Sequence, residues 1–208
     1  MIKVIIVDDH PVVRRGLKQI IEDEPDMEVV GDAKSAGECF SLVRQTDCTL
    51  VVLDITLPDR NGFDVLKQLK YEHPKLHVLI LSAHPEDQYG LRLIKAGAAG
   101  YLMKEGAPEE LVLAIRKVNA GGKYVSASLA EKLVYQLGAL DKPPHENLSD
   151  REFQILCMIA EGKTPKDIAD KLCISEKTVS TYRTRILEKM KISTNAGLTR
   201  YALENHLV

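Results

Sequence analysis

Short runs of branched apolar residues alternate with helical patterns over the first 120 residues, and this alternation limits the possible folds more than any other feature. The clearest runs are 4–7, 50–53 and 78–81. Every position in them is apolar, as expected for strands that are covered on both faces. Weaker strand signals lie at 27–30 and 100–103.

The intervening segments have helical spacing. Val13, Leu17, Ile20 and Ile21 share one face of a helix that ends before Pro25. Asn61 is a suitable N-terminal cap for a second helix, and the last of the series runs from about Pro108 to the glycines at 121–122. Five strands alternating with five helices predict an α/β domain, a parallel sheet with helices on both faces.

After residue 122 the alternation stops. Residues 126–137 have the pattern of one helix, and residues 138–147, with two adjacent prolines, predict a flexible or extended connection. Beyond them only helical patterns occur, beginning with the capping-box spacing of Ser149 and Glu152. The prediction is an α/β domain at 1–120, a linker with a helix at 121–146, and an all-α domain at 147–208.

Composition limits the class of protein and the cellular compartment. Hydrophobic residues make up 45% and charged residues 28% of the chain, typical of a globular protein with a real core. No apolar run approaches the roughly 18 residues that a membrane span needs. We expect no leader sequence, because residues 1–3 run directly into the first predicted strand. The four cysteines show no metal-ligand spacing, so we expect reduced thiols in a cytoplasmic protein.

Charge is unevenly distributed. Residues 1–120 carry 15 basic and 19 acidic side chains, whereas residues 171–191 carry six basic and two acidic ones. A mildly acidic front and a locally basic rear favour different partners for the two ends, although ordinary surface variation is the alternative.

Polar side chains follow several of the predicted strands. Asp8 and Asp9 come directly after the first strand, and Asp54 comes directly after the third. In the flavodoxin-like order 2-1-3-4-5, these carboxylates converge beyond the carboxyl ends of the strands. Three close carboxylates repel one another unless a cation neutralises them, and Mg²⁺ suits such oxygen ligands. Ser82 and Lys104 reach the same edge, which completes a site suited to a phosphoryl group.

At this point the chain resembles a known family. The motifs at 8–11, 53–58, 81–83 and 97–104 are similar to those of the receiver domain of bacterial two-component response regulators. The resemblance implies that a sensor histidine kinase phosphorylates Asp54. It also implies that Asp9, Asp54 and the Thr56 carbonyl hold Mg²⁺, with Asp8 acting through water, and that Ser82 and Lys104 bind phosphoryl oxygens.

The resemblance also assigns a switch. Ser82 would move toward the phosphoryl group while Tyr101 turns inward; the alternative is a Tyr101 that only packs at the strand end. Thr56 and His84 stand where the family tunes water access, or they are ordinary surface residues. His10 is not expected to be a metal ligand or a base, because the other histidines form no constellation with it.

In the rear domain, apolar residues have the spacing of a helix-turn-helix. Ala169 would lie where the two helices touch and Ile174 in the turn. Cys173 stands at the turn position that glycine often occupies, and we expect this departure to be tolerated as long as its backbone is not left-handed. A three-helix domain without a role in nucleic-acid binding is the alternative.

The second helix of this motif argues for DNA binding. It is predicted to begin after Ser175 and to run to about residue 190, with Val179, Ile186 and Met190 on its apolar face. The opposite face carries small hydroxyls with basic neighbours, which suits the major groove. The candidate DNA-contacting residues are Lys177, Ser180, Thr181, Thr184, Arg185 and Arg183, the last lying toward the apolar side.

The motifs at 148–152, 159–163, 167–169 and 174–180 resemble the LuxR-type DNA-binding domain, so nearly the whole chain is similar to NarL/FixJ-family response regulators. The resemblance implies a DNA-binding transcription regulator that is not an enzyme beyond its own phosphoryl transfer and loss. It also implies a homodimer, when phosphorylated or DNA-bound, through the helix at 194–206, although a helix packed on its own domain would show the same spacing.

Two alternative functions are also considered. A haloacid-dehalogenase-like phosphohydrolase also uses a nucleophilic Asp and Mg²⁺, but it places an Asp-x-Asp motif after the first strand, whereas Asp8 and Asp9 are adjacent. A receiver-like module that is never phosphorylated is disfavoured because every expected site residue is present.

Overall fold

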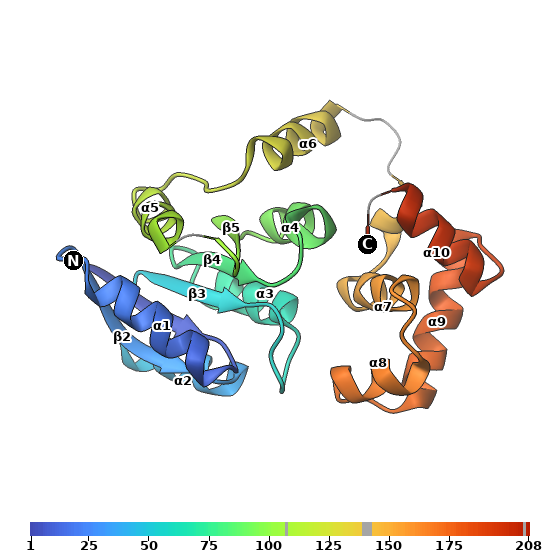
Figure 1. Ribbon diagram of the computed structural model, residues 1–208, viewed down its shortest axis with the longest axis horizontal. Helices are drawn as coiled ribbons and strands as arrows, with labels where there is room; N and C mark the ends of the chain where they lie inside the picture. Colours follow the sequence, from blue (N-terminus) through green and yellow to red (C-terminus); the bar gives the residue numbers. More distant parts are fainter. Residues whose placement is uncertain (107, 139–142, 206) are drawn as a thin grey trace. The chain divides into compact units, whose positions relative to one another are not determined.

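The computed structural model describes residues 1–106, 108–138, 143–205 and 207–208, and the chain divides into two compact units (Figure 1). The first unit is Met1–Ala130 and the second is Glu131–Val208. Among the described residues, no helix combines the length and the apolar character needed to cross a membrane.

The first unit is built on a five-stranded sheet. Its strands are β1 (Ile2–Val7), β2 (Met27–Ala33), β3 (Leu50–Asp54), β4 (His77–Ser82) and β5 (Gly100–Met103). All neighbouring strands pair in parallel, in the order β2-β1-β3-β4-β5. The predicted fold and strand order are therefore confirmed.

Helices cover both faces of this sheet, because successive strand residues point to opposite sides. On one face, α1 (Pro11–Glu22) and α5 (Pro108–Asn119) pack on alternate residues such as Val4, Val52 and Leu79. The intervening residues, such as Ile5 and Ile80, are equally buried on the other face. The remaining helices of the unit are α2 (Ala36–Gln45), α3 (Gly62–Glu72) and α4 (Glu86–Lys95).

The loop that follows β3 is held tightly before α3 begins. The Asn61 side chain caps α3 by accepting a hydrogen bond from the Phe63 amide at 3.0 Å, as predicted. Gly62 lies directly against the Ile55 backbone, where an added Cβ would collide with the Ile55 Cα. A residue with a side chain at position 62 would therefore push this loop, and with it the end of β3, out of place.

The predicted linker helix is present as α6 (Ala127–Gly138), and the boundary between the two units falls inside it. Part of the predicted connection at 138–147 lies outside the described residues. Its last four residues form a short 3₁₀ helix, η1 (Pro144–Asn147), where a flexible or extended chain was expected. Pro144 at the first position of η1 has the fixed φ that suits a helical start.

The second unit contains α7 (Asp150–Ala160), α8 (Pro165–Leu172), α9 (Glu176–Met190) and α10 (Asn195–Glu204). Helix α7 packs on α9 and α10, and α8 packs on α9. The fully buried side chains of Ile155, Ile186 and Leu198 form part of its core. The expected helix at 194–206 is thus shorter, with Thr194 as its cap and its last expected residue, His206, outside the described part.

The turn between α8 and α9 departs from the expectation for Cys173. Its backbone is left-handed, with φ of 51° and ψ of 45°, although it carries a side chain. This conformation costs about 1–2 kcal/mol for a residue other than glycine. The amides of Cys173 and Ile174 donate hydrogen bonds to the carbonyls of Asp170 and Ala169, respectively. These bonds at the end of α8 therefore impose the left-handed conformation on Cys173, although it is not glycine.

The predicted capping box at the start of α7 extends into a contact with α9. The Glu152 carboxylate accepts hydrogen bonds from the Ser149 amide at 2.8 Å, the Ser149 hydroxyl at 2.9 Å and Lys189 Nζ at 2.6 Å. Burial opposes the charge of Glu152, but these contacts outweigh it and hold its pKa below the ordinary value of 4.5. The charged carboxylate therefore stabilises the folded unit.

Glu152→Gln is expected to lower the free energy of unfolding by about 1–2 kcal/mol near neutral pH, because it removes a charged acceptor of three hydrogen bonds. A folded-state pKa below the unfolded one gives stability that is present above the unfolded pKa and is lost as the pH falls through the folded pKa. In thermal unfolding followed by circular dichroism, the stability of the variant should therefore fall less than that of the native chain as the pH is lowered. Glu188→Gln, an exposed change on α9, is the control, and equal effects of the two changes would contradict the assignment.

Candidate functional site

The predicted carboxylate cluster forms at the carboxyl edge of the sheet. Asp8 and Asp9 follow β1, and Asp54 is the last residue of its neighbour β3. Asp8 and Asp54 are almost fully buried, whereas Asp9 is partly exposed. Because parallel strands end at one edge, the chain brings these side chains together without any further device.

Lys104, just beyond β5, connects two of the carboxylates. Its Nζ lies 2.5 Å from Asp8 Oδ2 and 2.7 Å from Asp54 Oδ2. The other Asp54 oxygen accepts a hydrogen bond from the Thr56 amide at 3.0 Å. The Lys104 amide donates to the Ser82 carbonyl at 2.8 Å, which fixes the lysine backbone beside β4. Five of the predicted site residues, namely Asp8, Asp54, Thr56, Ser82 and Lys104, are therefore connected by hydrogen bonds and an ion pair.

Burial shifts the pKa values of Asp54 and Lys104, the pair at the centre of the site. It raises the pKa of Asp54 above its ordinary value, and the contacts from Lys104 and Thr56 offset only part of this shift. Burial also disfavours the Lys104 ammonium, but the contacts with the Asp54 and Asp8 carboxylates outweigh it and raise the pKa of the lysine. A positive charge held beside a crowded group of carboxylates is suited to an incoming anion such as a phosphoryl group.

The donor set fits a hard divalent cation. Ligand atoms of Asp8, Asp9, His10 and Asp54 all lie within 4.8 Å of one another. Asp8 Oδ2 and Asp9 Oδ1 are buried and lack a well-aligned hydrogen bond, although Lys104 Nζ and His10 Nδ1 are close to them. Clustered carboxylate oxygens of this kind are ligands that Mg²⁺ prefers.

His10 is closer to the site than the sequence indicated. Its Nδ1 lies 2.6 Å from Asp9 Oδ1 and 3.2 Å from Asp8 Oδ1. The His10 amide also donates to Asp8 Oδ1 at 2.8 Å. The absence of other histidines nearby was the wrong criterion, because the turn after β1 folds the ring back onto the two preceding carboxylates. His10 is therefore a neighbour of the predicted ligands.

The predicted switch residues are connected by hydrogen bonds through His84. The buried Ser82 hydroxyl accepts from the His84 amide at 3.0 Å, and the Tyr101 hydroxyl donates to the His84 carbonyl at 2.6 Å. Tyr101 points inward and is only 3% exposed, and burial raises its pKa to about 12, so its hydroxyl keeps its proton. The β4–α4 loop thus connects the end of β4 to the aromatic side chain on β5.

Two residues that sequence reasoning missed support this edge. The Asp59 carboxylate accepts from the Ala36 and Gly37 amides at 2.9 and 3.0 Å, which ties the loop after Asp54 to the start of α2. Arg14 donates to the Asp8 carbonyl at 2.8 Å and to Asp32 at 2.9 Å. The periodicity of the sequence could not reveal either contact, since each joins segments that are distant in the sequence.

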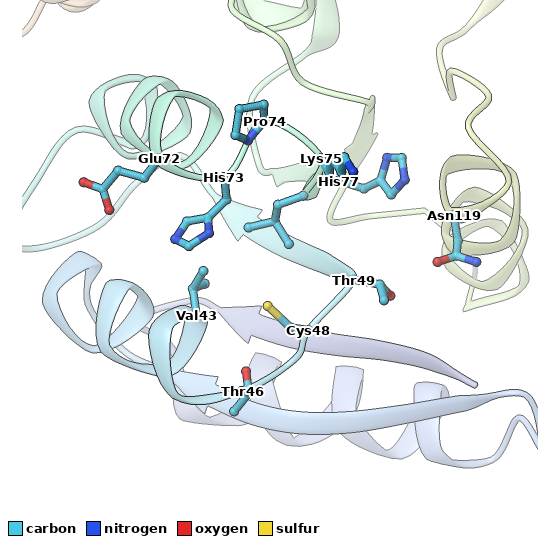
Figure 2. A pocket seen from close by; sticks show the side chains of 11 residues that line it. Val43, Thr46, Cys48, Thr49, Glu72, His73, Pro74, Lys75, His77 and Asn119 are labelled. Atoms are coloured by element: carbon cyan, nitrogen blue, oxygen red, sulfur yellow. The ribbon is translucent and has the colours of Figure 1, made fainter.

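A hollow lies elsewhere, at the amino-terminal ends of β3 and β4 (Figure 2). It has a volume of about 670 Å³, and Val43, Cys48 and His73 face it, whereas Glu72 points away. Among the described residues, only the group around Asp8 brings three or more candidate metal ligands together. The hollow therefore has no group of three or more candidate metal ligands of the kind found at the opposite edge of the sheet.

In the second unit, α9 has the two faces that the sequence predicted. Val179, Ile186 and Met190 are buried. The exposed residues include five of the candidate DNA-contacting side chains: Lys177, Ser180, Thr181, Thr184 and Arg185. The Thr181 and Thr184 hydroxyls donate to helix carbonyls one turn back at 3.0 and 3.1 Å, which leaves their methyl groups and oxygen lone pairs at the surface.

Arg183 differs from the other candidates. It is half-buried, and its Nε donates to Asn195 Oδ1 at 2.6 Å at the start of α10. The guanidinium therefore connects α9 to the start of α10. The predicted position of Arg183 toward the apolar side agrees with this contact.

Comparison with known proteins agrees with both units. The model of the response regulator receiver domain matches residues 4–116, and that of the luxR family of bacterial regulatory proteins matches residues 146–202. The response regulator GacA of Pseudomonas aeruginosa is 39% identical over 211 residues, which cover 100% of this chain and 98% of GacA. The transcriptional regulatory protein LiaR of Bacillus subtilis is 36% identical over 210 residues and 100% of both chains.

A solved structure is similar over almost the full length. RcsB from Salmonella enterica serovar Typhimurium, bound to promoter rprA in the presence of phosphomimetic BeF3⁻, has a TM-score of 0.67 and 25% identity, covering 97% of this chain and 98% of RcsB. A carboxylate-edged parallel sheet followed by a helix-turn-helix unit defines a two-domain signalling regulator. The chain belongs to the NarL/FixJ family of two-component response regulators, which join a receiver domain to a LuxR-type helix-turn-helix domain. The phosphohydrolase alternative is thereby excluded, since these full-length relatives are regulators.

Proposed function

We propose that a sensor histidine kinase phosphorylates Asp54 and that this switches the binding of the chain to double-stranded DNA. The observation that carries the proposal is the convergence of Asp8, Asp9, Asp54 and Lys104 at one sheet edge. The proposed domain limits are 1–120 for the receiver, 121–146 for the linker and 147–208 for the DNA-binding domain. We further propose a cytoplasmic protein that forms a homodimer when phosphorylated or bound to DNA.

The chemistry follows from the contacts at the edge. One Asp54 oxygen attacks the phosphorus of the donor, forming an acyl phosphate as the bond between phosphorus and the donor breaks. Lys104 lies where it neutralises phosphoryl oxygens, and the Ser82 hydroxyl lies at the end of the neighbouring strand as a second partner. Asp8, Asp9, Asp54 and the Thr56 carbonyl would hold Mg²⁺, which supplies further neutralisation of the phosphoryl charge.

The two leading aspartates should differ in their effect on Mg²⁺ binding. Asp8 is buried and paired with Lys104, so it would act on the metal through water, whereas the more exposed Asp9 would bind it directly. We expect Asp8→Ala to weaken Mg²⁺ binding by about tenfold, as loss of an outer partner does, and Asp9→Ala to weaken it further. A titration with Mg²⁺ checks the order, and a larger loss for Asp8→Ala would reverse the two roles.

The exposed face of α9 divides its contacts with DNA by side-chain type. Lys177 and Arg185 are long and charged and should meet phosphates, whereas the short Ser180, Thr181 and Thr184 reach base edges only when the helix docks closely. Arg183 stays a candidate phosphate contact, although its Nε already donates to Asn195 Oδ1.

Thr181→Ala should weaken binding to the specific site by about 1 kcal/mol, roughly fivefold, while leaving binding to scrambled DNA nearly unchanged. Lys177→Ala is the matched comparison. It should weaken binding to both DNAs, and the slope of log affinity against log salt concentration should fall by about one, as for the loss of one phosphate contact. Fluorescence anisotropy at several salt concentrations separates the two effects. Equal weakening of specific and scrambled binding by Thr181→Ala would show that α9 is rotated from the proposed orientation.

Genome-wide DNA binding of the native chain and of Asp54→Ala tests the proposal as a whole. We expect discrete binding sites for the native chain and a marked loss of occupancy at the same sites for the variant. A native chain without discrete sites would contradict DNA recognition. Equal occupancy in both chains would contradict control through Asp54.

A further inference from the structure

His10 lies at the solvent-exposed side of the carboxylate cluster. Its side chain is 64% exposed, and its Nδ1 atom lies 2.6 Å from Asp9 Oδ1 and 3.2 Å from Asp8 Oδ1. The other oxygen of Asp8, Oδ2, lies 2.5 Å from Lys104 Nζ. The two sides of the cluster therefore differ in kind. An ammonium group pairs with the carboxylates on one side, and an imidazole nitrogen joins them on the other.

The backbone holds the His10 ring in this position. Pro11 is the first residue of α1, and the residue before a proline is restricted to extended conformations. His10 accordingly has φ of −85° and ψ of 113°, and its amide donates to Asp8 Oδ1 at 2.8 Å. The ring forms no capping hydrogen bond with α1. The local turn therefore sets its approach to the carboxylates, and its nitrogen is not needed to begin the helix.

The contact between His10 and Asp9 has the spacing of two metal ligands and not the alignment of a hydrogen bond. Asp9 Oδ1 is buried, and no donor in the described part of the chain is aligned with it, although Nδ1 is only 2.6 Å away. Two neighbouring ligands of an octahedral ion, each about 2.1 Å from it, are about 3.0 Å apart. The separations of 2.6 and 3.2 Å from Nδ1 to the two carboxylates lie on either side of this value. A dication would therefore be able to engage the ring nitrogen and Asp9 Oδ1 together.

An imidazole ligand changes which metal ion the cluster favours. Mg²⁺ prefers oxygen ligands and keeps several of its waters, so it gains little from a ring nitrogen. Dications of the first transition series accept imidazole, and their affinity for nitrogen and oxygen ligands rises from Mn²⁺ through Fe²⁺ and Co²⁺ to Ni²⁺. We propose that His10 is a ligand of the metal site and gives it a preference for such a transition-metal dication over Mg²⁺. The inference rests on the metal site of the proposed function and adds a ligand and a class of ion to it.

A ligand and an outer partner of the metal are distinguished by the ratio of two affinities. A His10 ring that only donates to Asp9 and orients it would affect every ion that Asp9 binds, Mg²⁺ included. A ring that binds the metal affects only those ions that accept nitrogen. His10→Asn separates the two roles, because the Asn amide keeps a hydrogen-bond donor but no imidazole nitrogen. Asn is also a favoured N-cap residue, so α1 should begin as in the native chain.

Calorimetric titrations of the full chain with Mg²⁺ and with Co²⁺, at one pH and one ionic strength, test the proposal. We expect His10→Asn to weaken Co²⁺ binding by about tenfold or more, since even the loss of an outer partner of a metal has an effect of this size. Mg²⁺ binding should change much less, because water takes the place of the ring. His73→Ala is the matched control, because His73 is half-buried at the opposite edge of the sheet, and it should change neither affinity.

Proton NMR of the Co²⁺ complex identifies the ligand directly. An imidazole that binds through Nδ1 keeps its proton on Nε2. The unpaired electrons of Co²⁺ shift this exchangeable proton far outside the ordinary range of the spectrum. One such signal should appear in the native chain and in His73→Ala, and it should be absent from His10→Asn.

Each contrary result has one meaning, because labelling of Asp54 by acetyl phosphate and Mg²⁺ is measured on the same preparations. Unchanged Co²⁺ affinity in His10→Asn, or equal weakening of Co²⁺ and Mg²⁺, would overturn the inference. A shifted ring signal that persists in His10→Asn would do the same. Labelling of Asp54 in the native chain would leave the proposed function intact in all three cases. A native chain that binds neither ion and is not labelled at Asp54 would overturn both the inference and the proposed function.

Discussion

Replacing Asp54 by alanine or asparagine is expected to abolish acyl-phosphate formation from acetyl phosphate and Mg²⁺. Asp54 lies at the centre of the group, with Lys104 Nζ at 2.7 Å and the Thr56 amide at 3.0 Å. The nucleophilic oxygen is removed in both variants, and a neutral side chain does not substitute for it. The loss should be complete, as measured by mass spectrometry of the intact chain or by its acid-stable but base-labile phosphate.

The fold should survive this change. Burial disfavours the charged form of Asp54, so a neutral residue removes a destabilised charge, and Lys104 keeps Asp8 as its partner. Asp64→Asn, at an exposed carboxylate on α3, is the matched control and should be labelled like the native chain. Phosphate incorporation into Asp54→Ala at the native level would show that another group is the acceptor.

The sheet and the positions of its carboxylates were predictable because both follow from local patterns. Apolar runs such as 50–53 identify buried strands, and a residue directly after such a run must lie at the carboxyl edge. Asp54 and Asp8 needed no more information than this. The same is true of the buried face of α9, where helical periodicity selects Val179 and Ile186.

Other features depend on contacts between distant segments or on backbone geometry, and the sequence carried no sign of them. Asp59 lies 22 or 23 residues from the amides it holds. His10 joins the carboxylates because of the direction of a single turn, and Cys173 is left-handed because the end of α8 requires it. The linker helix was predicted, but its contact with α4 was not, since it depends on the fit of Leu129 over Gly90.

Phosphorylation of the full chain is expected to raise its affinity for specific DNA by about 10- to 100-fold, which corresponds to about 1.4–2.7 kcal/mol. The phosphoryl group adds roughly −1.5 to −2 charge beside Lys104 and Ser82, which gives the receiver a new set of charge-assisted contacts. A ligand shifts an equilibrium between two conformations only by its difference in affinity for them, and contacts of this kind supply a few kcal/mol. The measurement is DNA affinity with and without acetyl phosphate, at one fixed salt concentration because phosphate contacts depend on salt.

Asp54→Asn is the control and should bind DNA equally in both conditions. Comparison with residues 147–208 expressed alone then identifies the origin of the gain. If the isolated domain binds specific DNA as well as the phosphorylated chain does, the receiver restrains the domain and phosphorylation removes the restraint. If it binds no better than the unphosphorylated chain, restraint is excluded and the gain comes from dimer formation, which predicts a steeper dependence of binding on protein concentration. An unchanged affinity after stoichiometric phosphorylation would contradict the switch itself.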